Sequence, residues 1–364
     1  MLTERVALLG TGLIGGSIGL RLRRDRPEIE VVGFDTNASA LRAAHDRDAV
    51  SATSISPEGA VAGADLVVLA APVEQARLLC KAIDSAVGES GVVTDVGSAK
   101  ASIVAEGERA FGERFVGGHP MAGSERHGIE AADERLFEGA SWILTPTART
   151  SPEAYGTVSE LVAGLGATAV AVDPTEHDAL VARLSHLPQL VASALVEVAA
   201  GAGDREALLG LAASGFRDVT RIAASHPDLW VEIIRANRGP VLDALGGLEG
   251  RLAGLSKVIE DSRWDELGSF FDRARSARMD LFAKPDLAGD PVTLSLLVPD
   301  RPGVLAEVTT AAGQIGANIE DLRIVHSTEG GRGRLELVVV GRERAGQLVG
   351  ELVSLGYHVE RGES

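Results

Sequence analysis

The stretch RVALLGTGLIGGSIGLRL, residues 5–22, decides the fold of the first part of the chain. It begins as a short apolar run, turns through Gly10, Gly12 and Gly15, and continues with the spacing of an amphipathic helix. A second apolar run, EVVGFD, ends in Asp35, 20 residues beyond Gly15. Glycines alone are a weak signal in a chain that has 43 of them, but this order of strand, turn, helix, strand and acid is typical of a dinucleotide-binding unit.

Each motif residue has a physical task in such a unit. Gly10 permits the tight turn, Gly12 lets the pyrophosphate approach the backbone, and Gly15 lets the helix pack on the strand. Asp35 can accept hydrogen bonds from the ribose hydroxyls and repels a 2′-phosphate, which favours NAD over NADP. The residues predicted to bind NAD are Gly10, Gly12, Leu13, Ile14, Gly15, Asp35, Ala71 and Pro72.

Further apolar runs continue the rhythm of a doubly wound sheet. Strands are predicted within residues 64–72, 91–100, 114–120, 141–146 and 167–172. Ligands of such sheets bind beyond the carboxyl ends of the strands, where Ser98 and His119 both fall. A lone histidine is more often structural than catalytic. Its position beside the predicted nicotinamide nevertheless makes His119 the leading catalytic candidate.

The spacing becomes helical from about Thr175. Pro188 falls inside a helical pattern, which predicts a kink in the turn that carries His186. Arg217 and Arg221 lie four residues apart and share a helix face, and Arg221 is the better candidate for an anionic ligand. The following helices have broad apolar faces, which predicts burial against a second subunit.

The last part of the chain reads as a separate small domain. The segment FAKPDLAGDP, residues 282–291, is a linker by composition, and the strand and helix patterns after it predict a split βαβ unit of ferredoxin-like type. Gly303, in the turn PDRPGVLAEV, opens backbone N–H groups that could hold a carboxylate.

The composition limits the function classes. The formal net charge of −17 argues against nucleic-acid and anionic-membrane partners, so an anionic substrate must meet local arginines. Cys80 is the only cysteine, which excludes an intrachain disulfide and a cysteine metal site. The N-terminal segment is a poor signal peptide, and no stretch is expected to approach the ~18 apolar residues of a membrane span. These features predict a cytoplasmic protein without a metal.

The expected fold class is α/β, with three parts. A Rossmann-type doubly wound NAD-binding domain spans residues 1–172, and an all-helical substrate and dimerisation domain spans 173–283. A linker at 284–291 leads to a regulatory domain at 292–362 of ferredoxin-like βαββαβ type.

The chain resembles the prephenate dehydrogenases of the TyrA family that carry a C-terminal ACT domain. The resemblance covers essentially the whole chain and rests on GTGLIGGS, TDVGSAK, GGHPMAGSE, LSHLPQ and GFRDVTRIAASHPDLW, which occur in the family's order and spacing. It implies NAD-dependent oxidative decarboxylation of prephenate to 4-hydroxyphenylpyruvate in tyrosine biosynthesis, by a homodimer. Arogenate dehydrogenation, which gives tyrosine directly, is the alternative.

The resemblance also implies roles for individual residues. His119 is similar to the residue that takes the proton of the substrate's 4-hydroxyl as hydride leaves, and Ser98 to its orienting partner. The implied substrate-binding residues are His186, Arg221, Ser124, Glu125 and Trp230, with Arg221 facing a carboxylate and Glu125 pairing with that arginine. A dianionic substrate in an acidic protein needs such a guanidinium group.

The ACT resemblance predicts an amino-acid effector, with tyrosine favoured. The expected effector residues are Gly303 and Gly316, through their backbone N–H groups, and Asn318, through its carbonyl. The alternative is that this domain only adds dimer surface.

Two departures from the family pattern, Gln189 after HLP and AASGF before the arginine helix, leave the choice between prephenate and arogenate open. Two rival classes are weaker. The 3-hydroxyacid dehydrogenases need a lysine on the first long helix of the second domain, and residues 175–201 contain none. A non-catalytic NAD and amino-acid sensor would not need Ser98, His119, His186 and Arg221 together.

Overall fold

The computed structural model describes residues 4–123, 126, 128–201, 214–281, 291–299, 301–326 and 332–361 of the 364-residue chain. The chain forms two compact units, residues 1–255 and 256–364. Ser124 and Glu125, both expected to bind substrate, lie outside the described residues, as does the expected linker except for Pro291.

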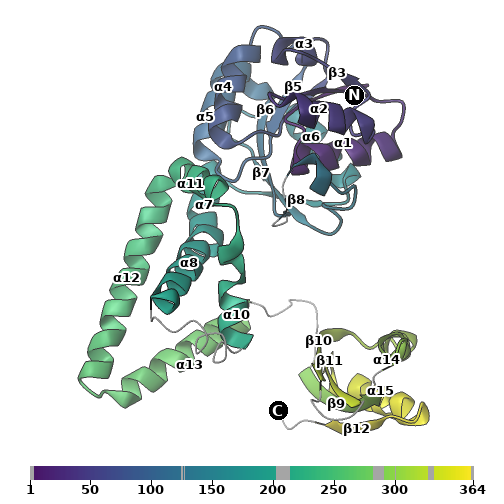
Figure 1. The fold of residues 1–364 in the computed structure, drawn as a ribbon, viewed down its shortest axis with the longest axis vertical. Coiled ribbons are helices and arrows are strands. Elements are labelled where there is room, and N and C mark those ends of the chain that lie inside the picture. The colour runs from purple at the N-terminus through teal and green to yellow at the C-terminus, as the bar shows by residue number, and fades with distance from the viewer. Residues whose placement is uncertain are drawn as a thin grey trace. The chain divides into compact units, whose positions relative to one another are not determined.

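One sheet organises the first unit (Figure 1). Within the described residues it has eight strands in the order β3-β2-β1-β4-β5-β6-β7-β8. The strands are β1 Arg5–Leu9, β2 Glu30–Phe34, β3 Ala52–Thr53, β4 Leu66–Leu69, β5 Val92–Asp95, β6 Phe115–Pro120, β7 Ser141–Thr145 and β8 Thr168–Ala171. The predicted doubly wound arrangement is confirmed, since β1 to β6 pair in parallel with the topological switch between β1 and β4.

The strand β7 departs from that pattern because it runs antiparallel to β6. In the described part of the connection between Pro120 and Ser141, the only helical element is the short 3-10 turn Ile129–Ala131. A parallel return needs a full crossover, usually a helix, so this shorter connection brings the chain back in the opposite direction.

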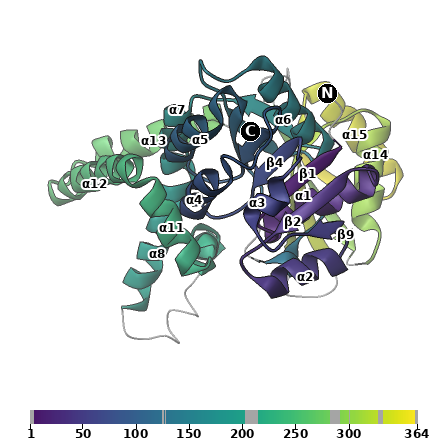
Figure 2. The same cartoon turned by 90° about the horizontal axis from the view of Figure 1, so that it is seen from above.

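Helices cover both faces of the sheet, and β1 shows why. Its residues alternate, with Val6 and Leu8 packing into one apolar core and Ala7 and Leu9 into the other. On the first face lie α1 Leu13–Asp25, α2 Ala38–Asp46 and α6 Pro152–Gly164, and on the second α3 Pro57–Val61, α4 Val73–Ile83 and α5 Ala101–Phe111. Figure 2 shows α4 and α5 on one side of the sheet and α1 and α2 on the other.

The middle of the chain is helical, as expected. Its elements are α7 Pro174–Val181, a π-helical turn Ala182–His186, α8 Leu187–Ala200, α10 Ser214–Thr220, a 3-10 turn Arg221–Ala224, α11 Pro227–Ala236, α12 Arg238–Glu260 and α13 Trp264–Leu281. The helix α11 packs against α4 of the first domain.

The disturbed turn predicted from Pro188 is the π-helical turn. Pro188 has no N–H group, so the carbonyl of Leu184 loses its ordinary helical partner. The chain accommodates this with a wider turn in which Leu187 N–H donates to the carbonyl of Ala182, five residues earlier. His186 is the last residue of this turn and is buried.

The continuous run Pro174–Ala200 is long and apolar enough to cross a membrane by length and composition, with a mean hydropathy of 1.4. The expectation that no stretch approaches a membrane span was therefore wrong. Core helices of water-soluble proteins pass the same test. Since this run holds His177, Asp178 and His186 in buried hydrogen bonds, we attribute its apolar surface to protein packing.

The C-terminal domain has the predicted βαββαβ order. Its elements are β9 Pro291–Pro299, α14 Val304–Gln314, β10 Ile319–His326, β11 Arg332–Val340, α15 Arg342–Ser354 and β12 His358–Arg361. The strands form an antiparallel sheet in the order β10-β11-β9-β12. Leu294, Leu296, Val308, Leu337 and Leu348 belong to its core, which identifies a domain with its own hydrophobic interior.

Candidate active site

The turn between β1 and α1 has the geometry of a pyrophosphate site. Gly10 has a φ of +105°, where a side chain is strained. A Cβ atom on Gly10 would collide with the carbonyl oxygen of Ala70, and one on Gly15 with the carbonyl oxygen of Gly10. A Cβ on Gly12 would meet no atom within 4 Å, so the space above this helix N-terminus is open. Leu13, Ile14 and Gly15 form the first turn of α1.

Asp35 stands directly after β2, at the far side of the same turn. Its Oδ2 atom accepts hydrogen bonds from the N–H and the hydroxyl of Thr11 at 2.8 and 3.1 Å, and its Oδ1 atom accepts from Asn37 N–H at 2.8 Å. These bonds fix a half-buried carboxylate at the rim of a cavity of about 530 Å³. The cavity is lined by Gly10, Gly12, Phe34, Asp35, Thr36, Ala70, Ala71, Pro72, Gln75, Leu78, Leu79 and Ala82. The residues present therefore fit a dinucleotide.

His119 lies near the end of β6, on the edge of the sheet where the dinucleotide turn also lies. The strand ends of β1, β4, β5 and β6 share this edge because these strands are parallel. Ser98 follows β5, the neighbour of β6, and is half-buried. Within the described residues no hydrogen bond joins Ser98 to His119, so the structure brings the two to one edge without a direct contact.

A buried ion pair holds the ends of β5 and β6 together. The ammonium of Lys100 bonds to Asp95 Oδ2, and both side chains are fully buried. The same ammonium donates to the carbonyl of Gly118 at 2.6 Å, and the other oxygen of Asp95 accepts from Gly118 N–H at 3.2 Å. Burial lowers the pKa of Lys100, while Asp95 and Asp178 oppose that shift. The backbone next to His119 is therefore fixed from both sides.

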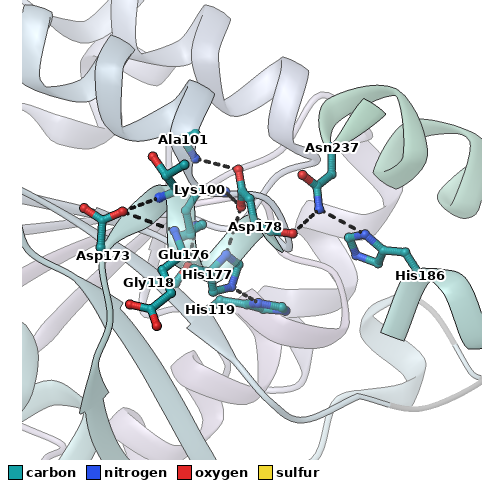
Figure 3. Close-up of polar contacts among 12 residues, drawn as sticks. Lys100, Ala101, Gly118, His119, Asp173, Glu176, His177, Asp178, His186 and Asn237 are labelled. Carbon is teal, nitrogen blue, oxygen red and sulfur yellow. Dashed lines mark hydrogen bonds and ion pairs between the residues drawn. The ribbon is translucent and has the colours of Figure 1, made fainter. Parts of the chain in front are cut away.

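His119 is joined to two residues that carry no role in the sequence analysis (Figure 3). Its Nδ1 atom lies 2.9 Å from Nε2 of His177, and Nδ1 of His177 lies 2.9 Å from Oδ1 of Asp178. The two rings meet edge to face, with centroids 5.1 Å apart at 72°. His177 and Asp178 both come from α7 and are buried.

The environment keeps His119 neutral. Burial is the largest cause that lowers the pKa of His119 well below its ordinary value, and Lys100, His177 and His186 lower it further. A neutral imidazole can accept a proton at neutral pH, as a general base must. His119 is therefore in the right state for the role that the sequence predicts.

His186 is neutral for a similar reason. Burial lowers the pKa of His186 to about 4, against the opposing effect of Asp178. The amide of Asn237 donates to the carbonyl of Asp178 at 2.8 Å and faces His186 Nδ1 at 3.2 Å (Figure 3). With Nδ1 as an acceptor, a neutral His186 carries its proton on Nε2 and can donate to a ligand. Its ring meets that of Trp230 edge to face, with the centroids 6.0 Å apart.

Arg221 begins the 3-10 turn Arg221–Ala224 and is exposed in the single chain. This turn packs against α8, the helix that follows His186. Arg217, on α10, is exposed as well. Within the described residues, no group of three or more His, Cys, Asp or Glu side chains has the geometry to hold a metal ion.

Sequence reasoning missed five residues of this network, which are Asp95, Lys100, His177, Asp178 and Asn237. Asp95 and Lys100 stand inside the quoted TDVGSAK motif, and His177 and Asp178 stand nine and eight residues before His186. A signal was thus present in two charged residues flanking Ser98 and in a His-Asp pair at the start of an apolar helix. Asn237 gave no such signal.

Family models match three successive parts of the chain. Residues 18–171 match the nucleotide-binding domain of prephenate dehydrogenase, residues 173–273 its dimerisation domain, and residues 294–357 an ACT domain like that of the AHAS small subunit.

Individual relatives extend the likeness over most of the chain. The prephenate dehydrogenase of Bacillus subtilis is 33% identical over 92% of this chain and 91% of its own length. The crystal structure of prephenate dehydrogenase from Aquifex aeolicus in complex with hydroxyphenyl propionate and NAD+ has a TM-score of 0.71 at 33% identity, and covers 77% of this chain and 99% of its own. The arogenate dehydrogenase of Synechocystis has a TM-score of 0.67 at 30% identity, over 76% of this chain and 99% of its own.

Proposed function

The chain belongs to the prephenate dehydrogenase family, whose members are NAD-dependent oxidoreductases, and from this premise we propose that His119 is its catalytic base. The reaction is the oxidative decarboxylation of prephenate to 4-hydroxyphenylpyruvate, a step of tyrosine biosynthesis. One observation carries the proposal for His119. A neutral histidine with lowered pKa stands at the C-terminal end of β6, on the sheet edge that holds the dinucleotide turn.

In this reaction His119 accepts one proton from the substrate and later returns it. Bound NAD supplies the hydride acceptor. Nε2 of His119 accepts the proton of the substrate's 4-hydroxyl while the carbon that bears this hydroxyl is oxidised to a ketone. The ring then loses carbon dioxide and becomes aromatic, and the protonated His119 can return its proton to the phenolate oxygen. Ser98, at the end of the neighbouring strand, orients the same hydroxyl.

The substrate's carboxylates are assigned to cationic and donor groups around His119. A neutral His186 donates from Nε2, and Arg221 supplies the guanidinium that a dianion needs in a chain with net charge −17. Trp230 packs edge to face beside His186, and on this contact it is assigned to the substrate pocket. Ser124 and Glu125 lie outside the described residues, so their assignment to the pocket rests on the sequence alone.

Arogenate is the second candidate substrate, favoured by one feature of the site. Gln189 is buried, at 5% exposure, and its Oε1 atom has no hydrogen-bond partner among the described residues. An unpartnered acceptor near His186 suits a substrate with an ammonium group, which arogenate carries and prephenate does not. The Synechocystis relative shows that the family includes arogenate dehydrogenases.

The protein's assembly is proposed as a homodimer. Residues 173–273 match a dimerisation domain, and its helices expose large apolar side chains in the single chain. Those more than half exposed are Leu184, Val198, Val219, Leu229, Val231, Leu242, Leu252, Ile259, Trp264 and Phe271. A second copy covering these side chains would remove an apolar surface that water-soluble proteins rarely expose.

The proposed location of the protein is the cytoplasm.

The proposed effector is tyrosine, bound by the ACT domain. Gly303 has a φ of +94° and caps α14, and Gly316 has a φ of +65°. Both glycines and Asn318 are exposed. Gly316 N–H donates to the carbonyl of Gly313 at 3.1 Å and the Asn318 carbonyl accepts from Val340 N–H at 3.4 Å, so an effector would have to share or replace these two bonds. We also propose that the NAD-binding domain ends near residue 172 and that the helical domain ends near residue 283.

The test is NAD reduction by the purified protein with prephenate and with arogenate side by side, followed by identification of the products. We expect NADH to form together with carbon dioxide and 4-hydroxyphenylpyruvate from prephenate. NADH with tyrosine from arogenate alone would establish the second candidate. NAD binding without turnover of either substrate would remove the proposed activity and favour a non-catalytic sensor.

A further inference from the structure

Three side chains form a continuous hydrogen-bonded chain that ends at the proposed base. His119, His177 and Asp178 are linked by two contacts of 2.9 Å each (Figure 3). Exposure is 2% for His177 and 4% for Asp178, so water does not compete for these bonds. The ring atom Nε2 of His119 has no hydrogen-bond partner among the described residues.

Asp178 is the fixed end of this chain because it is ionised. Burial alone would raise the pKa of Asp178, but hydrogen bonds from His177 and from the backbone N–H groups of Lys100 and Ala101 outweigh burial and lower it. Those two backbone bonds measure 2.7 and 2.9 Å, one to each carboxylate oxygen. An ionised carboxylate only accepts hydrogen bonds, so His177 must donate to it from Nδ1.

The direction of the second bond follows from the first. When Nδ1 carries the only ring proton of His177, Nε2 has a lone pair and is the acceptor in the contact with His119. Nδ1 of His119 must then carry the donated hydrogen. A neutral imidazole has one N–H group, so Nε2 of His119 is left unprotonated.

We propose that His177 and Asp178 are positioning residues that hold His119 in the Nδ1–H tautomer, so that Nε2 is the atom that accepts the substrate's proton. This inference rests on the proposed role of His119. The opposite tautomer would present an N–H group to the substrate hydroxyl and could not take its proton. When His119 becomes protonated, its Nδ1–H bond to His177 remains, and the carboxylate of Asp178 stabilises the positive charge through the intervening ring.

A purely structural role is the rival explanation. Asp178 also joins α7 to the first residues of α5, so its loss could simply loosen the site. Lys100 and Asp95 also lie close to His119 along the chain fold, and they bond to each other and to the backbone of Gly118. They do not bond to the His119 ring, so only the chain through His177 selects its tautomer within the described residues.

The experiment compares His177→Phe with His177→Gln in the full-length protein. Phenylalanine keeps a ring of similar size but removes both hydrogen bonds, whereas the glutamine carbonyl can still accept from Nδ1 of His119. We expect His177→Phe to lower kcat by about 10²- to 10⁴-fold, the range seen when a base is lost or held in the wrong tautomer. His177→Gln should recover at least an order of magnitude of that loss, with KM for prephenate and Kd for NAD within a few-fold of wild type.

A second readout distinguishes tautomer selection from stability. The ¹⁵N spectrum of the His119 ring should show a protonated Nδ1 and an unprotonated Nε2 in wild type at neutral pH, and a changed tautomer ratio in His177→Phe. Asp173→Ala is the matched control, because Asp173 caps the same helix through bonds to Thr175 and Glu176 N–H. It should lower Tm while leaving the spectrum unchanged and kcat within a few-fold.

Three results would overturn the inference. They are a protonated Nε2 on His119 in wild type, a His177→Phe kcat within a few-fold of wild type, or no difference in kcat between phenylalanine and glutamine. If wild type turns over neither prephenate nor arogenate, the proposed function fails instead, and the wild-type spectrum still decides the direction of the hydrogen-bonded chain.

Discussion

At the scale of single residues, the site holds two histidines with different roles, the half-buried His119 and the buried His186. Burial lowers the pKa of both His119 and His186, so neither is a cation at neutral pH. The hydrogen bonds then assign their atoms: His119 offers a lone pair, whereas His186 offers an N–H group. A dianionic substrate would therefore need its positive charge from another residue, and we propose Arg221 for that role.

Replacing Arg221 by alanine should act mainly on KM for the substrate. Both the bound substrate and the transition state carry the carboxylate, so losing the guanidinium weakens both to a similar extent. Truncating one partner of a close charge pair costs roughly 2–5 kcal/mol, which is about thirtyfold to several thousandfold. Steady-state kinetics with prephenate measure this change. Arg217→Ala is the control on the neighbouring helix. An unchanged KM in Arg221→Ala would show that Arg221 does not bind the substrate carboxylate.

Asp35 should decide the choice between the two nicotinamide cofactors. Its carboxylate stands at the rim of the dinucleotide cavity, where it repels a 2′-phosphate. Asp35→Ser removes that charge, so the ratio of kcat/KM with NAD to kcat/KM with NADP should fall towards one. Equal use of both cofactors by wild type would show that this interpretation of Asp35 is wrong.

At the scale of the elements, two glycines of the dinucleotide turn have different tasks. Gly15 allows α1 to pack closely, and Gly12 leaves room for the ligand. Gly15→Ala places a methyl group against the backbone oxygen of Gly10, whereas Gly12→Ala meets nothing in the protein. We expect Gly15→Ala to lower the free energy of unfolding by about 1–3 kcal/mol. Gly12→Ala should change it by less than about 0.5 kcal/mol.

NAD titration gives the complementary result for this pair. Gly12→Ala should weaken NAD binding by on the order of tenfold or more, because a loss of about 1.4 kcal/mol suffices. Urea unfolding and NAD titration of both variants check the two effects independently. Gly12→Ala with wild-type NAD affinity would contradict the placement of the pyrophosphate over this residue.

Several of the helices, strands and turns could be predicted from the sequence. The turn at Gly10, the strand ends at Ser98 and His119, and the disturbed turn before Pro188 are encoded by local patterns, and the structure has them where they were expected. The direction of β7 was not predictable, because alternation along a strand carries no information on its orientation in the sheet. The bond from His119 to His177 spans 58 residues and depends on how α7 docks beside β6.

At the scale of the whole molecule, a dehydrogenase and a small sensor-like domain occupy one chain. The ACT-like domain has its own core, so the expected linker before it is a place where the chain can be shortened. A chain that ends at Lys284 should keep kcat and NAD binding but lose inhibition by tyrosine. The tyrosine effect itself requires tighter binding to the inactive arrangement, with a coupling of typically 1–3 kcal/mol.

Inhibition assays on the full-length protein and on the shortened one check this prediction. Phenylalanine and tryptophan serve as the matched ligands. If the full-length protein ignores all three aromatic amino acids at millimolar levels, the effector proposal fails and the domain's role is dimer surface.

The role of His119 as the catalytic base is tested most directly by kcat for His119→Asn. Asparagine keeps an amide near the position of Nδ1, so the bond to His177 can persist, but it has no atom in place of Nε2. We expect kcat with prephenate to fall by about 10²- to 10⁴-fold while NAD affinity stays unchanged. A kcat within a few-fold of wild type would contradict it and remove His119 from the mechanism.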